Sequence, residues 1–188
     1  MSQVFGLYRK RKTHWESFQA SQTYKVYGLH NFEKIPQIQS LSKQQQFSMR
    51  VVANVFPFRV NEYVINELID WSNIPDDPIF QLTFPQPGMM DPEDFEEVGQ
   101  LLKKNPDKLK LNKLVAEIRK KLNPHPGEQK SLNVPSLDDN ELEGIQHKYR
   151  ETVLFFPGRG QTCHSYCTFC FRWAQFIGDK ELKFSSNE

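Results

Sequence analysis

The sequence predicts an α/β fold in which a mainly helical N-terminal domain leads into the first strand of a larger sheet. Two observations predict the helices: residues 40–54 place apolar side chains at helical spacing, and residues 109–122 do the same. A third observation predicts the strand: residues 153–156 (VLFF) form a continuous apolar run that ends at Pro157 and Gly158. Such a run is typical of a strand that is buried on both faces, as in a parallel sheet covered by helices.

The helical part has recognisable boundaries. Residues 1–38 show no clear periodicity, and we expect them to be irregular. Residues 39–122 are expected to form the helical domain. Within it, Asn61 is a suitable N-cap for the helix that follows, and Asp91 with Pro92 is a strong helix start.

Two proline-rich stretches connect these segments. Residues 74–92 contain five prolines, and we expect them to be ordered but extended, because proline and the residue before it resist helix. Asp76 and Asp77 in this stretch have the composition of a metal pair, but we favour a turn before Pro78. Residues 123–147 are again interrupted by proline and glycine, and we interpret them as a long connecting arm.

Residues 148–188 predict the start of a sheet that this chain does not complete. A buried parallel strand needs partner strands, which are joined through crossover connections of about a dozen residues or more. The 18 residues after Cys170 are too few for such connections. A full (β/α) barrel takes about 250 residues. We therefore expect the chain to be the N-terminal part of a longer protein.

The composition narrows the classes of function. The chain has 188 residues and a formal net charge of +1, so its charge gives no indication of binding to nucleic acid or to a membrane. The N-terminus lacks the apolar stretch of a secretory signal. All three cysteines lie within eight residues, whereas exported disulfide proteins usually carry an even and dispersed set. We expect a cytoplasmic protein that uses its thiols for metal or redox chemistry.

Cys163, Cys167 and Cys170 form the candidate site, with spacings of four and three residues. Those spacings also fit one face of a helix, so three packed core cysteines are one alternative. Structural zinc needs one ligand more than the three thiols provide, and His147 or His125 would have to supply it. Three thiolates that hold an iron–sulfur cluster would leave one iron open to a small chelating molecule, which is the interpretation we favour.

The motif CHSYCTFC (163–170), with Phe169 directly before the last cysteine, resembles the radical S-adenosylmethionine (radical SAM) superfamily. Further stretches are similar to the lysine 2,3-aminomutase family and together touch much of residues 50–188. These stretches are PFR (57–59), DDP (76–78) before QLTFPQ, the NVPSLDDNELEGIQHKY approach to the strand, HKYRETVLFF (147–156) and CFRWAQF (170–176).

The resemblance implies that the helical domain leads into a truncated radical SAM (β/α) barrel. It implies a 4Fe–4S cluster on the three cysteines, S-adenosylmethionine (SAM) on the open iron near Phe169, and pyridoxal 5′-phosphate (PLP) as second cofactor. The implied activity moves the amino group of an amino acid between C2 and C3. Arg172 stands where family members bind the substrate carboxylate, a contact that suits a planar guanidinium. An electron donor such as flavodoxin or ferredoxin, and a homo-oligomeric full-length enzyme, are also implied.

The resemblance places the PLP lysine and the acidic groups for the substrate ammonium beyond residue 188, so no catalytic residue is assignable here and the isolated chain is expected to be inactive. After the last cysteine, Phe171, Arg172 and Trp173 stand where better-known members have a threonine and several arginines. Thr152 stands where they have an arginine before the strand. These differences leave the substrate open to another amino acid or a protein lysine. A non-enzymatic zinc-binding module is the second alternative.

Overall fold

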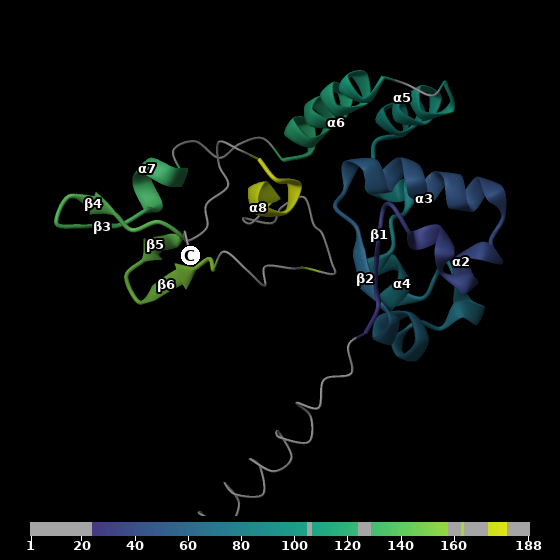
Figure 1. Ribbon diagram of the computed structural model, residues 1–188, viewed down its shortest axis with the longest axis horizontal. Coiled ribbons are helices and arrows are strands. Elements are labelled where there is room, and N and C mark those ends of the chain that lie inside the picture. The colour runs from purple at the N-terminus through teal and green to yellow at the C-terminus, as the bar shows by residue number, and fades with distance from the viewer. Residues whose placement is uncertain (1–23, 105–106, 124–128, 158–162, 164–172, 180–188) are drawn as a thin grey trace, which may run out of the picture.

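The computed structural model describes residues 24–104, 107–123, 129–157, 163 and 173–179. In chain order, the elements are β1 (Val26–Gly28), η1 (Phe32–Lys34), α2 (Pro36–Gln39), α3 (Lys43–Val55), β2 (Arg59–Asn61), η2 (Val64–Leu68), η3 (Trp71–Asn73), α4 (Pro78–Thr83), η4 (Pro87–Met89), α5 (Pro92–Lys103), α6 (Lys108–Leu122), α7 (Gln129–Asn133), β3 (Ser136–Leu137), β4 (Asn140–Glu141), β5 (Ile145–Tyr149), β6 (Thr152–Phe155) and α8 (Trp173–Ile177). Figure 1 shows two parts. The elements from β1 to α6 form a helical body, and α7 with β3–β6 forms a smaller part to the left of this body.

The antiparallel pair β1–β2 covers the first of two hydrophobic cores. Tyr27 lies opposite Val60 in this pair, and both side chains are buried. Gly28 allows a close approach, because a Cβ atom there would lie 3.1 Å from the Phe58 carbonyl oxygen. The buried residues of this core, which we call core 1, are Tyr27, Phe32, Ile35, Ile38, Met49, Val60, Val64, Ile65, Ile69, Phe80 and Phe84.

The described part of residues 1–38 differs from the irregular segment that we expected. Residues 24–38 contain β1, η1 and the start of α2. Phe32, Ile35 and Ile38 from this stretch are fully or almost fully buried in core 1. Elements of three or four residues are too short to show a period in the sequence, so only their packing reveals them.

α3 confirms the helix predicted for residues 40–54 and separates core 1 from a second core. Ser42 and Gln45 form a capping box at its start. The helix ends at Val55 because Phe56, which precedes Pro57, takes an extended conformation. The buried residues of the second core, core 2, are Val51, Val52, Val55, Phe56, Met90, Val98, Val115, Ile118 and Trp173.

α5 and α6 pack on α3 and complete core 2. Asp91 caps α5 by accepting a hydrogen bond from the Glu93 N–H at 3.0 Å, as the sequence predicted. Arg119 joins α6 to the end of α3, since it donates from Nε to the Val55 carbonyl at 2.6 Å and from Nη2 to the Asn54 carbonyl at 3.3 Å. Burial lowers the pKa of Arg119, but a guanidinium stays charged at neutral pH and suits the negative end of a helix dipole.

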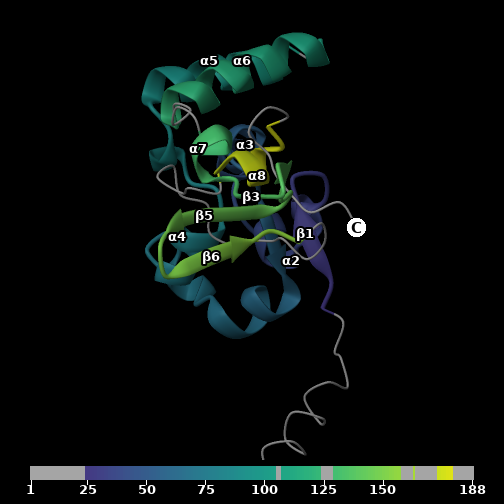
Figure 2. The same ribbon diagram turned by 90° about the vertical axis from the view of Figure 1, so that its left-hand side faces the viewer.

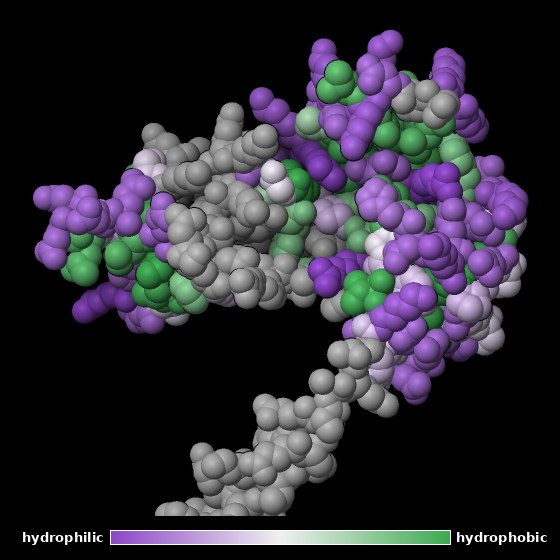
Figure 3. All heavy atoms as spheres, viewed as in Figure 1, coloured by the Kyte–Doolittle hydropathy of each residue, from purple (hydrophilic) through white to green (hydrophobic). Residues whose placement is uncertain are grey.

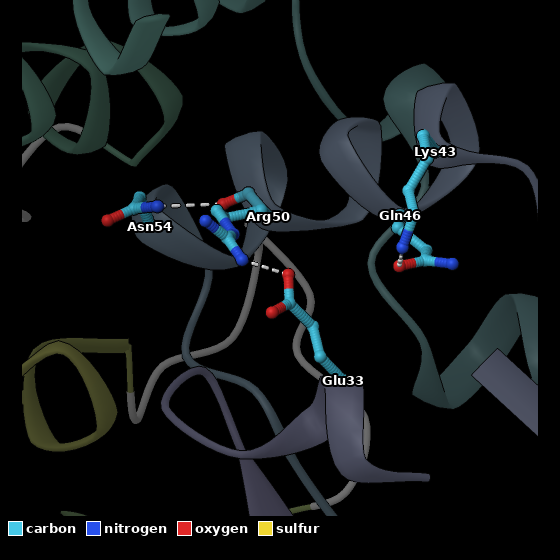
Figure 4. A network of polar contacts seen from close by, with 5 residues as sticks. All are labelled: Glu33, Lys43, Gln46, Arg50 and Asn54. Carbon is cyan, nitrogen blue, oxygen red and sulfur yellow. Dashed lines mark hydrogen bonds and ion pairs between the residues drawn. The ribbon is translucent and has the colours of Figure 1, made fainter. Parts of the chain in front are cut away.

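An ion pair connects α3 to η1. Figure 4 shows Arg50 of α3 in an ion pair with Glu33, while the Asn54 side chain donates to the Arg50 carbonyl at 2.7 Å. The two charged side chains are 47 % and 41 % exposed. Exposed pairs stabilise a fold only weakly, so core 1 and core 2 hold α3 in place more than this contact does.

Residues 74–92 are helical in part, so the extended conformation predicted for them is wrong at α4 and η4. Pro78 occupies the first turn of α4, where proline favours a helix, and Asp77 caps the turn. Asp77 is buried; its Oδ1 accepts from the Phe80 N–H at 2.7 Å and its Oδ2 from the Asp70 N–H at 3.2 Å. Residues 74–76 form the turn that we favoured before Pro78, and Asp77 after this turn is the helix cap.

Replacement of Asp77 by alanine is expected to lower the free energy of unfolding by about 1–3 kcal/mol, because the buried Phe80 N–H and the part-buried Asp70 N–H lose their acceptor. Urea unfolding followed by circular dichroism measures the change. Asp76→Ala is the matched control, since Asp76 is exposed and should change stability by about 0.5 kcal/mol or less. Equal losses in the two variants would contradict the capping role of Asp77.

β6 differs from the buried parallel strand predicted for residues 153–156. It pairs antiparallel with β5, with Gln146 opposite Leu154. Val153 and Phe155 are 59 % and 62 % exposed, whereas Phe156 is buried. A short link between two strands favours antiparallel pairing, and an apolar run alone does not reveal which neighbours cover it.

The β5–β6 hairpin stands apart from the helical body. Figures 1 and 2 show that α8 lies between the hairpin and the helical body. Figure 3 shows hydrophobic residues at the surface of the hairpin. All three strand pairs within the described residues are antiparallel. In the same ranges, no helix has both the length and the apolar composition to cross a membrane. The domain boundaries at residues 38, 122 and 147 stay predictions.

Candidate metal centre

Cys163 is the one predicted ligand that lies within the described residues. It is half-buried and forms no disulfide with another described residue. Cys167, Cys170, Phe169 and Arg172 lie outside the described residues, so their assigned roles stay predictions. In the part of the chain that the structure describes, no three His, Cys, Asp or Glu side chains gather as a metal site. This result does not test the predicted centre, because two of its three thiols are not included.

The chain enters the cysteine segment from a fixed position at the end of β6. The Phe156 N–H donates to the Gly144 carbonyl at 2.7 Å, which extends the pairing of the hairpin by one residue. The Phe156 side chain is 3 % exposed, although β6 itself is exposed. This contact of the hairpin lies seven residues before Cys163.

The chain leaves the cysteine segment at a second fixed position, Trp173 at the start of α8. Trp173 is 4 % exposed and packs edge-to-face on Phe56, with ring centroids 5.8 Å apart. Ile177 packs against the same core. Phe156 in the hairpin and Trp173 in core 2 are therefore the packed residues that precede and follow the cysteine motif in the sequence.

Sequence reasoning missed this role of Trp173, which we noted only as a departure from the family pattern. A signal was present, because Trp173, Phe176 and Ile177 have the spacing of one apolar helix face. The indole N–H of Trp173 is buried and has no hydrogen-bond partner among the described residues. A buried donor without a partner costs about 1–3 kcal/mol, so packing on Phe56 must outweigh this cost.

The histidines proposed as a fourth zinc ligand gain no support from the described residues. His147 lies on β5 with an exposed side chain. His125 lies outside the described residues. Zinc through His147 thus requires an exposed strand residue to reach the cysteine segment.

A cavity of about 230 Å³ beside α3 offers no catalytic chemistry. Its lining contains no ionisable side chain: Leu41, Gln44, Gln45, Ser48, Met49, Ile74, Pro75, Phe80, Pro85, Gln86 and Pro87. Acid–base catalysis needs titratable groups in reach of a substrate, and a serine such as Ser48 needs an adjacent base to act as a nucleophile, which this lining lacks. The cysteine segment is therefore the stronger candidate for chemistry in this chain.

Comparisons of the chain with models of known protein families, with curated proteins and with solved structures gave no match. The assignment of the site therefore depends on the residues of the chain and on their resemblance to the radical SAM motif.

Proposed function

We propose that this chain is the N-terminal part of a radical SAM, PLP-dependent amino-acid 2,3-aminomutase. The observation that carries the proposal is the three thiols at spacings of four and three in a chain that has no other cysteine. Thiolates are the usual protein ligands of iron–sulfur clusters, so the donor set fits the group. The half-buried position of Cys163 is consistent with a ligand, and reduced thiols fit a cytoplasmic protein.

In this proposal Cys163, Cys167 and Cys170 hold the 4Fe–4S cluster and leave one iron for the amine and carboxylate of SAM. The bound cofactors supply one-electron chemistry and a PLP electron sink, with an electron donor such as flavodoxin or ferredoxin. Phe169 contacts the adenine of SAM. Arg172 binds the substrate carboxylate with two parallel N–H donors. The PLP lysine belongs to a part of the enzyme outside this chain, so the 188-residue protein alone is expected not to turn over an amino acid.

Arg172 directly precedes Trp173, and the Trp173 side chain is fixed in core 2. A side chain next to an anchored residue has fewer positions to search, which lowers the entropic cost of binding a substrate carboxylate.

Anaerobic reconstitution with iron and sulfide, followed by electron paramagnetic resonance (EPR) of the reduced protein, tests the proposal. We expect a cluster signal that shifts when SAM is added. Methylthioadenosine is the matched control, because it keeps the adenosine and the sulfur but lacks the amine and carboxylate, and it should cause no shift. A protein that binds zinc and no iron–sulfur cluster would refute the proposal and support the zinc-binding module.

The substrate class needs a separate experiment on the full-length protein. Turnover of free lysine or another amino acid to its 3-amino isomer, with loss on removal of PLP, supports the aminomutase. Modification of a lysine in a protein partner, without turnover of free amino acids, would favour the alternative reaction on the same cluster.

A further inference from the structure

α5 and α6 form an antiparallel pair of helices, and one face of this pair points outward. The link between them is short, which favours antiparallel neighbours. Their direction follows from the ion pair between Asp94 near the start of α5 and Lys121 near the end of α6, at 3.0 Å. Because this pair aligns residue 94 with residue 121, Leu101 of α5 is level with Leu114 of α6.

A groove of about 370 Å³ runs between the two helices. Each helix lines it with four residues at the spacing of one helix face, and the lining residues are Glu97, Gln100, Leu101, Lys104, Lys110, Lys113, Leu114 and Glu117. Half-buried Leu101 and Leu114 form the apolar centre of the groove. Figure 3 shows hydrophilic side chains around hydrophobic ones over α5 and α6.

The charges of the groove are separated by sign along its length. Glu97 and Glu117 line one end, and Lys104 and Lys110 line the other, next to the turn between the helices. Lys113 lies between the centre and the lysine end. Within one chain, each end therefore brings like charges together across the groove, which is unfavourable.

These charges are available to a partner. All five side chains are exposed, and no ion pair joins any of them to another residue in the described ranges. Within the described part of the chain, neither end of the groove therefore has an ion pair of its own. A partner that brings lysines to the glutamate end and glutamates to the lysine end would remove both repulsions.

We propose that this partner is a second copy of the same chain, bound groove to groove about a twofold axis through Leu101 and Leu114. A twofold interface must be self-complementary, and this surface has that property. At about 1.5 Å rise per residue, Glu97 and Lys110 lie about 6 Å from the level of the leucines, and Lys104 and Glu117 about 4.5 Å. The axis therefore places each glutamate pair of one copy on lysines of the other, with the leucines at the centre.

The interface is small and its attraction is mainly electrostatic, so the dimer is weak and sensitive to salt. The net charge of +1 per chain adds little long-range repulsion between copies. We expect the dimer dissociation constant to rise by about tenfold or more between about 50 mM and about 500 mM salt.

Charge reversal on the full 188-residue protein, followed by sedimentation equilibrium, tests the proposal. Lys104→Glu with Lys110→Glu makes the lysine end of the groove acidic, and Glu97→Lys with Glu117→Lys makes the glutamate end basic. Each double variant alone is expected to dimerise about a hundredfold less than the unmodified chain, because like charges then meet in the dimer. A mixture of the two variants is expected to form a heterodimer, since an acidic groove then faces a basic one.

Lys34→Glu with Lys148→Glu is the matched control for the acidic variant, because it lowers the net charge by the same amount at exposed lysines outside the groove and should leave dimerisation unchanged. The proposal is overturned if the unmodified chain stays monomeric at low salt, or if its dimer survives both reversals. A mixture of the two variants that stays monomeric would also overturn it. Circular dichroism of each variant verifies that its helices are intact.

Discussion

Replacement of Cys163 by alanine is expected to abolish retention of a 4Fe–4S cluster after anaerobic reconstitution. The proposed centre has only three protein ligands, so loss of one leaves two thiolates for the whole cluster. Iron and sulfide content per chain should fall from about four of each to a background value, and the EPR signal should disappear. Cys163 follows the anchored Phe156 and lies outside both cores, so the far-ultraviolet circular dichroism spectrum should not change.

His164→Ala is the control for this experiment, because His164 is adjacent to Cys163 but is not a proposed ligand. This variant is expected to keep both the cluster and its response to SAM. Full iron and sulfide content in Cys163→Ala would remove Cys163 from the ligand set. Loss of the cluster in both variants would show that the local conformation, and not the thiol, limits binding.

Replacement of Phe84 by alanine is expected to reduce the free energy of unfolding by about 3–5 kcal/mol, which is a large part of the stability of a small domain. Phe84 is fully buried in core 1. Its ring centroid lies 5.0 Å from that of Phe80, 5.2 Å from Phe58 and 5.7 Å from Trp71. Alanine would leave a cavity among three rings that belong to different segments, and these segments have little freedom to close it.

Urea unfolding with tryptophan fluorescence measures this loss, because Trp71 is one of the rings that contact Phe84. Leu82→Ala is the matched control: Leu82 precedes Phe84 by two residues and is 55 % exposed. It should change the free energy of unfolding by about 0.5 kcal/mol or less. A comparable effect of the two substitutions would contradict the packing of core 1 described above.

The longer helices were predictable from the residues. α3 and α6 bury one face each, and their apolar residues repeat at helical spacing over three turns or more. Caps were predictable for the same reason, since they depend on neighbours within three residues. Asp91 caps α5 as predicted, and the Asn61 side chain accepts from the Val64 N–H at 3.0 Å at the start of η2.

Shorter elements were not predictable in the same way. β1 has three residues, α2 has four, and their place in core 1 depends on β2 and on residues far along the chain. Pro78 was taken as a sign of extended chain, although the buried cap Asp77 makes it the start of α4. The same proline is compatible with both conformations, and the burial of Phe80 against Trp71 and Phe84 decides between them.

The candidate site also has one part that the sequence predicts and another that only the tertiary structure decides. The amino-acid sequence alone determines the donor chemistry of the centre, because the number, type and spacing of the three thiols are properties of a short stretch of chain. Tertiary structure alone decides where the residues on either side of that stretch lie, with Phe156 in the hairpin and Trp173 in core 2. It also decides that β6 is exposed and antiparallel. Local patterns record the preference of a segment for helix or strand, whereas burial depends on which distant side chains come to cover it.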